Sequence, residues 1–146
     1  MGLRTYNFDI EMLLKDAGLV AASAAATVDS ADKVLDAGQA RLDGVVVVDV
    51  SAIEIASNNE VYDIILQGSS SATFASDIEN LAALNLGATE VRKASAIDSI
   101  AGRYEMPFTN EQAGVTYRYL RLYTVVAGTI ATGINYTAFV APQQGR

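Results

Sequence analysis

The pattern that decides the fold lies in the stretch TYRYLRLYTV, which runs from Thr116 to Val125. Its side chains alternate between two sides of an extended chain, with Tyr117, Tyr119, Arg121 and Tyr123 on one side and Arg118, Leu120, Leu122 and Thr124 on the other. A period of two is the signature of a β-strand with one buried face. Because Leu120 and Leu122 suit a core better than arginine does, we expect them to point inward and the tyrosines outward.

Strand signals recur on both sides of this stretch. Further strands are expected at residues 45–50, 61–67 and 130–140, with shorter apolar pieces at 81–86, 91–97 and 104–108. Turns rich in Gly, Ser and Asn separate these segments, which predicts an antiparallel β-sandwich or a barrel. Pro107 has no N–H to give to a central strand, so we expect it at an edge strand or a strand end.

The alanine-rich segment LVAASAAATVDSADKVLDA, residues 19–37, gives a conflicting signal. Alanine favours a helix. The segment has no wide stripe of large apolar side chains, however, and Val20, Thr27 and Val28 are β-branched. Local propensity on its own therefore favours a helix only slightly.

The N-terminal segment mixes polar side chains with scattered large apolar ones. Its apolar residues alternate with polar neighbours from Tyr6 to Met12, which predicts an extended conformation. This segment is interpreted as a first strand, a tail, or an arm that packs on a neighbouring subunit. For the arm, the expected contact residues are Tyr6, Phe8, Met12 and Leu13.

The length of 146 residues suits one domain with a proper hydrophobic core. We therefore divide the chain into an extended N-terminal arm, residues 1–16, and a single β-sandwich domain, residues 17–146. On this division we expect the sandwich to fold without residues 1–14.

The sequence contains no histidine and no cysteine. It therefore lacks the residues of Ser-His-Asp and Cys-His nucleophiles, of structural zinc sites and of disulfide bonds. The usual ligands of haem and of iron–sulfur clusters are missing as well. We expect a protein that is not an enzyme, with no catalytic residue, no cofactor and no metal site.

Three carboxylates, those of Asp29, Asp32 and Asp36, fall within eight residues. Oxygen ligands of this kind suit a hard cation such as calcium, but the spacing and the glycine of an EF-hand loop are missing. Solvation and turn formation by aspartate explain the cluster adequately.

The net charge of −7 is unevenly spread. Eleven acidic and four basic residues lie in residues 1–63, whereas the rest of the chain carries six of each. An acidic chain is repelled by phosphate backbones, so we expect no direct contact with nucleic acid. The apolar stretch at 17–26 is shorter than the roughly 20 residues that cross a bilayer, so we expect no membrane partner.

The expected outward row of Tyr117, Tyr119, Arg121 and Tyr123 is the most informative surface. Tyrosine and arginine are enriched at binding hot spots because they combine large area with a polar end. The alternative is an ordinary core face with tyrosine hydroxyls at its rim, which would leave Arg121 in need of a partner. We favour an interface.

Several segments together carry a family resemblance. They are DIILQGS at 63–69, LAALNLG at 81–87, GRYEMPFTNE at 102–111, YRYLRLY at 117–123 and NYTAF at 135–139. In this order, and over nearly the whole chain, the sequence resembles the capsid decoration (cement) proteins of tailed bacteriophages.

The resemblance implies a jelly-roll-like β-sandwich that assembles as a homotrimer on the exterior of the icosahedral head. There it would contact the major capsid protein and clamp neighbouring capsid subunits against internal DNA pressure, as a structural part of the virion. It also implies that the alanine-rich segment is β-structure, and we follow it there because tertiary context often overrides propensity.

Other functions remain open at this point. Jelly rolls also host lectins, so a carbohydrate-binding module is the first alternative, with exposed tyrosines stacking on sugars. A head-fibre or tail component of a virion is the second. A hydrolase that uses carboxylates alone is the third.

Overall fold

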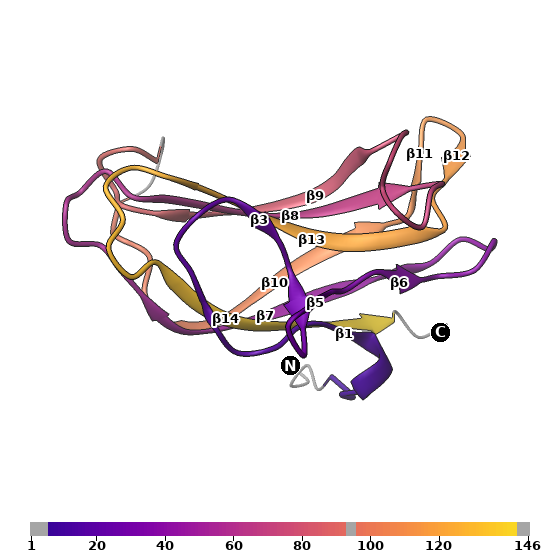
Figure 1. Cartoon of the computed structure of the whole chain (residues 1–146), viewed down its shortest axis with the longest axis horizontal. Helices are drawn as coiled ribbons and strands as arrows, with labels where there is room; N and C mark the ends of the chain where they lie inside the picture. Colours follow the sequence, from indigo (N-terminus) through magenta and orange to yellow (C-terminus); the bar gives the residue numbers. More distant parts are fainter. Residues whose placement is uncertain (1–5, 93–95, 143–146) are drawn as a thin grey trace.

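A computed structural model describes residues 6–92 and 96–142. Two antiparallel β-sheets pack face to face, one above the other in Figure 1. The first sheet contains, in spatial order, β1 (Leu13–Lys15), β14 (Ile134–Pro142), β7 (Asp43–Ile53) and β10 (Gly102–Thr109), with β2 (Leu19–Val20) also paired to β14. The second contains β3 (Ala24–Ala25), β13 (Tyr119–Ala127), β8 (Val61–Ser69) and β9 (Glu79–Gly87), with β6 (Leu35–Asp36) also paired to β13. The predicted β-sandwich is confirmed.

Smaller elements surround the two sheets. A short 3-10 helix, η1 (Ile10–Met12), precedes β1. Two hairpins stand apart from the sheets, one formed by β4 (Thr27–Val28) and β5 (Ala31–Asp32), the other by β11 (Glu111–Gln112) and β12 (Val115–Thr116).

The strand order is nested. If β1, β3, β7, β8, β9, β10, β13 and β14 are numbered one to eight along the chain, the sheets read 1-8-3-6 and 2-7-4-5. Strand one thus pairs with eight, two with seven, three with six and four with five. Nested pairs of this kind arise when one long antiparallel hairpin rolls up into two packed sheets.

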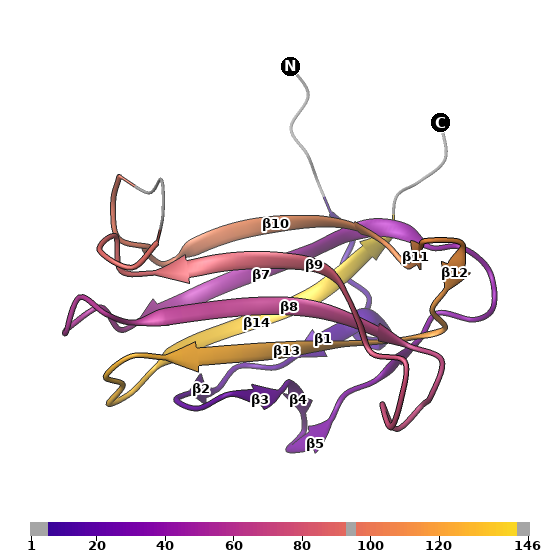
Figure 2. The same cartoon turned by 90° about the horizontal axis from the view of Figure 1, so that it is seen from above.

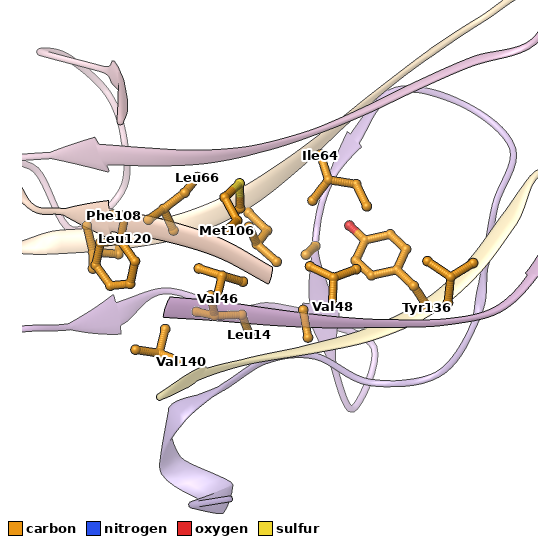
Figure 3. Close-up of a cluster of buried hydrophobic side chains, with 14 of the residues drawn as sticks. Leu14, Val46, Val48, Ile64, Leu66, Met106, Phe108, Leu120, Tyr136 and Val140 are labelled. Carbon is orange, nitrogen blue, oxygen red and sulfur yellow. The ribbon is translucent and has the colours of Figure 1, made fainter. Parts of the chain in front are cut away.

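The core lies between the sheets, where the alternation of β13 is as predicted. Leu120 and Leu122 are fully buried and belong to one cluster with Leu66 of β8 and with Val46 and Val48 of β7. Figure 3 shows Leu120, Leu66, Val46 and Val48 in this cluster. The buried hydroxyl of Tyr136 is satisfied by the Thr124 hydroxyl at 2.6 Å. Alternating strands therefore supply one apolar face each to a shared core.

Pro107 lies in β10, which is the edge strand of the first sheet, as expected. The expected short strand at 91–97 does not form in its described part, where Val91 and Arg92 belong to a turn and a bend. Residues 93–95 of that segment lie outside the described residues.

The alanine-rich segment is β-structure rather than helix. Its short strands border both sheets, and the Ala26 N–H donates to the Leu122 carbonyl oxygen at 2.9 Å. Alanine is small enough to let this chain pass close to β13, where Ala25 pairs with Tyr123. Pairing with the edges of existing sheets overrides the local helix propensity.

The end of the predicted N-terminal arm pairs with the first sheet. Residues Leu13–Lys15 form β1, an edge strand of the first sheet that pairs with β14. Leu14 is completely buried in the main core, and Lys15 is 4% exposed. Residues 13–16 therefore pack as part of the sandwich. A strand of three residues is too short for its alternation of polar and apolar side chains to be recognised in the sequence.

Lys15 is a buried ammonium group that is held by carbonyl oxygens. Its Nζ donates to the carbonyls of Asp16, Gly18 and Tyr136 at 2.9, 3.0 and 2.9 Å, and it lies 4.6 Å from the centre of the Tyr136 ring. Burial lowers the pKa of Lys15, and nearby Asp16 partly opposes this. The three carbonyls and the ring stabilise the charge and fix β1 against β14.

Two glutamates organise the loops at one end of the sandwich. The fully buried Glu60 accepts hydrogen bonds from the backbone N–H groups of Ala56, Ser57 and Asn59 at 2.8, 2.6 and 3.1 Å. Burial alone would raise the pKa of Glu60, but these N–H groups outweigh it and hold the pKa below its ordinary value. The carboxylate thereby replaces the strand partners that the β7–β8 loop lacks.

Glu54 acts in the same way on the β13–β14 loop. Its carboxylate accepts from the backbone N–H groups of Ala131, Thr132 and Gly133 at distances from 2.7 to 3.1 Å. The N–H groups, led by that of Gly133, lower the pKa of Glu54. Because Glu54 follows β7 and the loop precedes β14, the two central strands of the first sheet are tied together at this end.

We expect the stability of the protein to fall in acid, in part through Glu54. A carboxyl group whose pKa is lowered by folding contributes stability above its unfolded pKa, about 4.3, and this contribution is lost as the pH falls through the folded pKa. Urea unfolding of wild type and Glu54→Gln between pH 7 and pH 3 measures this contribution. The variant should be less stable at pH 7 and should lose less stability on acidification. Equal losses in the two proteins would exclude this role.

Candidate functional site

The outer face of the second sheet carries a row of large polar side chains. Tyr119, Arg121 and Tyr123 of β13 alternate with fully buried leucines and are half-buried on the opposite side of the strand. We call these three residues the outer row. The sequence predicted this alternation correctly.

Arg121 is the most constrained member of the outer row. Its guanidinium carbon lies 4.3 Å from the centre of the Phe74 ring and 5.6 Å from that of Tyr123. Its Nε donates to Gln67 Oε1 at 2.9 Å, and Gln67 Nε2 donates in turn to Asn80 Oδ1 at 3.2 Å. A ladder of side chains thus crosses β13, β8 and β9 and holds the guanidinium in one orientation.

Phe74 reaches Arg121 from the loop between β8 and β9. It has a φ of 55° and is only 6% exposed, and its N–H donates to the Ser71 carbonyl. A bulky side chain rarely adopts positive φ, so the loop holds a strained residue against the arginine. Sequence reasoning missed Phe74, because an isolated phenylalanine in a serine-rich loop gives no sign of what it packs against.

Tyr119 lies beside an ion pair at the start of β13. Arg118 donates from Nε and Nη2 to the two carboxylate oxygens of Asp36, each at 2.9 Å. This bidentate pair lowers the pKa of Asp36 to about 2. The Arg118 guanidinium lies 5.2 Å from the centre of the Tyr119 ring, so one face of that ring is already occupied.

Tyr117 does not belong to the outer row. It precedes β13, and its Cβ lies 2.8 Å from the position that a Cβ on Gly68 would take. Gly68 is buried and shares the inward face of β8 with Ile64 and Leu66. The alternation of inward and outward side chains breaks between Tyr117 and Tyr119. Tyr117 therefore packs against the inward face of β8, at Gly68.

A second candidate surface lies on the outer face of the first sheet. Val47, Phe139 and Ala141 form a separate buried cluster there, covered by Tyr6 and Leu13. Phe8 packs edge-on against Phe139, with ring centres 5.2 Å apart at an angle of 87°. Residues 6–13, which we call the N-terminal cover, thus form a partial third layer, seen with η1 below the first sheet in Figure 1.

The predicted contact residues of the N-terminal cover differ in how exposed their side chains are. Tyr6, Met12 and Leu13 are partly buried against their own chain, and Met12 packs on the main core. Phe8 is 57% exposed and the neighbouring Ile10 is 67% exposed. The exposed large apolar side chains of the N-terminal cover are therefore Phe8, one of the four predicted contact residues, and Ile10, which sequence reasoning did not select.

The aspartates at 29, 32 and 36 do not assemble into an ion site. Asp36 binds Arg118, whereas Asp29 and Ser30, with φ of 52° and 65°, form the turn of the β4–β5 hairpin. Within residues 6–92 and 96–142, no cluster of three metal-ligating side chains occurs. The turn-forming explanation accounts for this hairpin.

The alanine-rich segment lines a partly open pocket of about 430 Å³ next to Lys15 and Thr124. Both side chains already have partners within the chain, because Lys15 donates to three carbonyls and the Thr124 hydroxyl shares a hydrogen bond with Tyr136. Much of the remaining wall is alanine and glycine. The pocket therefore offers a ligand no unpaired polar group from these two side chains.

The chain matches none of the known protein-family models and none of the curated protein sequences with which it was compared. Over its described residues, no helix is long and apolar enough to cross a membrane. The candidate site consists of the two surfaces described above, the outer row and the N-terminal cover.

Proposed function

We propose that this protein is a decoration protein of a tailed-bacteriophage capsid. In this proposal it forms a homotrimer on the exterior of the head, contacts the major capsid protein and stabilises the junctions between capsid subunits. The sequence resemblance stated above suggests this role, and the arrangement of the two surfaces supports it.

The observation that carries the proposal is that the sandwich has contact residues on both of its outer faces. The outer row lies on the second sheet, and the N-terminal cover presents Phe8 and Ile10 on the first. A clamp needs one surface for its sister subunits and another for the shell. We assign the outer row to the sister subunits and the N-terminal cover to the shell.

The chemistry of the chain suits a purely structural task. A trimer on a symmetric shell repeats each weak contact, so avidity raises the overall affinity without any single tight site. The absence of histidine and cysteine from the sequence removes the common reactive groups. The net negative charge favours a position away from packaged DNA.

Replacing Phe8 and Ile10 by serine is expected to weaken binding to the shell. Each side chain loses about 1 to 2 kcal/mol of apolar burial at the contact, so affinity should fall at least about tenfold. Co-sedimentation with heads of the phage that encodes the chain measures this. Ile100→Ser is the matched control, because Ile100 is 65% exposed in the loop before β10.

Three results would contradict the proposal. Wild-type protein that fails to bind the heads excludes it outright. Equal losses of affinity for the double variant and for Ile100→Ser exclude the N-terminal cover as the contact. Binding to a polysaccharide but not to heads would favour the carbohydrate-binding alternative.

A further inference from the structure

Arg121 differs from the other arginines whose side chains the structure describes, because none of them combines a neutral side-chain partner with two unused terminal nitrogens. Arg92 donates from both terminal nitrogens to the carbonyl oxygens of Asn85 and Ile97, at 3.4 and 2.6 Å. Arg41, Arg103 and Arg118 each bind a carboxylate of their own chain, at 3.0, 2.7 and 2.9 Å. Within the described part of the chain, Arg121 binds no carboxylate and uses only its Nε, on the neutral Gln67. Its two terminal nitrogens therefore keep their N–H groups for another partner.

The contacts around Arg121 hold its guanidinium in one orientation, which favours binding to such a partner. Phe74 and Tyr123 lie against the guanidinium, and the ladder through Gln67 and Asn80 fixes its plane. A fixed guanidinium loses little conformational entropy on binding. Its preferred partner is a carboxylate, which accepts two parallel hydrogen bonds from its fork of N–H groups.

The same chain carries an exposed acidic projection. The β4–β5 hairpin, Thr27 to Asp32, pairs with neither sheet, and residues 29–32 at its end are all exposed. Figure 2 shows β4 and β5 beyond β13, on the side away from β8. The side-chain carboxylates of Asp29 and Asp32 bind no cation among the described residues. We call this hairpin the acidic hairpin.

The acidic hairpin and Arg121 point to different sides of one subunit. The hairpin projects from the edge of β13 that faces away from β8, between the pairings of Ala25 with Tyr123 and of Leu35 with Leu120. Arg121 instead lies over the face of the sheet and binds Gln67 on β8. Two complementary patches at different places produce a head-to-tail contact, which closes into a ring when the rotation allows it.

We propose that the acidic hairpin of one subunit binds Arg121 of the next, with the carboxylate of Asp32 as the principal partner of the guanidinium. This inference rests on the proposed trimer and names the contact that holds it together. It also gives the uneven charge of the chain a role, because the acidic first part of one copy meets a cation in the neutral second part of another.

A charge exchange tests the contact. Arg121→Asp and Asp32→Arg should each place like charges opposite one another and raise the trimer dissociation constant at least about tenfold, and the double variant should recover most of the loss. Sedimentation velocity over a range of concentrations gives the constants, and circular dichroism confirms folding. Arg121→Gln, which keeps a partner for Gln67 without the charge, serves if Arg121→Asp fails to fold. Arg41→Asp controls for net charge, because Arg41 already binds Asp43.

The possible outcomes separate this inference from the proposed function. Folded single variants that associate like wild type, or a double variant that recovers nothing, overturn the inference. A monomeric wild type that binds phage heads also overturns it; it leaves the proposed decoration of the capsid standing and excludes the proposed homotrimer. A trimer restored by the charge exchange but unable to bind heads supports the inference and excludes the proposed function.

Discussion

Deletion of residues 1–14 is expected to destroy the cooperative fold of this protein. The deletion removes Leu14 from the main core and uncovers Val47, Phe139 and Ala141. Loss of a buried leucine costs about 2 to 5 kcal/mol, and each newly exposed large side chain adds about 1.5 to 3 kcal/mol. Those losses reach the whole stability of an ordinary domain, about 5 to 15 kcal/mol.

Thermal melting followed by circular dichroism tests this expectation. Deletion of residues 1–8 is the control, because it spares the N-cap Asp9, η1 and β1 and should leave a cooperative transition at a lower temperature. A cooperative transition in the longer deletion, close to that of wild type, would show that β1 is dispensable. It would also restore the sequence-based view of residues 1–14 as a separate arm.

Gly133→Ala is expected to cost about 2 to 5 kcal/mol of stability. Gly133 has a φ of +93°, which a residue with a Cβ adopts only with strain of about 1 to 2 kcal/mol. The new Cβ would also overlap the backbone of Val20, lying 2.7 Å from its carbonyl carbon. Relief requires moving β2 away from β14, and such overpacking adds about 1 to 3 kcal/mol.

Gly18→Ala is the matched control for this substitution. Gly18 lies two residues before Val20, the residue that Gly133 approaches, but nothing comes within 4 Å of the position its Cβ would take. Its unfolding free energy, from urea titration, should stay within about 1 kcal/mol of wild type. If both variants lose equal stability, the close approach between Gly133 and Val20 does not hold in solution.

The parts of the fold that the sequence predicts are the long strands with one buried face. Leu120 and Leu122 repeat at the strand period and reach the core, and the edge position of Pro107 follows from its missing N–H. Both signals are local. A side chain's neighbours along the chain are enough to read them.

The parts that the sequence does not reveal depend on contacts between distant residues. Leu14 is core only because β14, more than 100 residues later, pairs with β1. The alanine-rich segment is extended only because the edges of both sheets are there to receive it. Phe74 covers Arg121 through a strained loop conformation that residue types do not encode locally.

In the candidate site, too, local sequence predicts some features, and contacts between distant residues determine the others. Alternation identified Tyr119, Arg121 and Tyr123 as one outward row, but it also included Tyr117, which the break before β13 turns inward. In the N-terminal cover, alternation grouped Tyr6 with Phe8 because both are large apolar side chains two residues apart. Only packing on Phe139 and Val47 separates the partly buried Tyr6 from the exposed Phe8 and Ile10.

The central claim is that this chain decorates the outside of a phage head as a trimer. Electron cryomicroscopy of the virion that encodes it tests this claim most directly. The proposal predicts three β-sandwiches on the outer surface of the shell, with the N-terminal cover against the major capsid protein and Arg121 facing the acidic hairpin of a sister subunit. Heads whose surface lacks these sandwiches, or density for this chain only in a tail or a fibre, would contradict it.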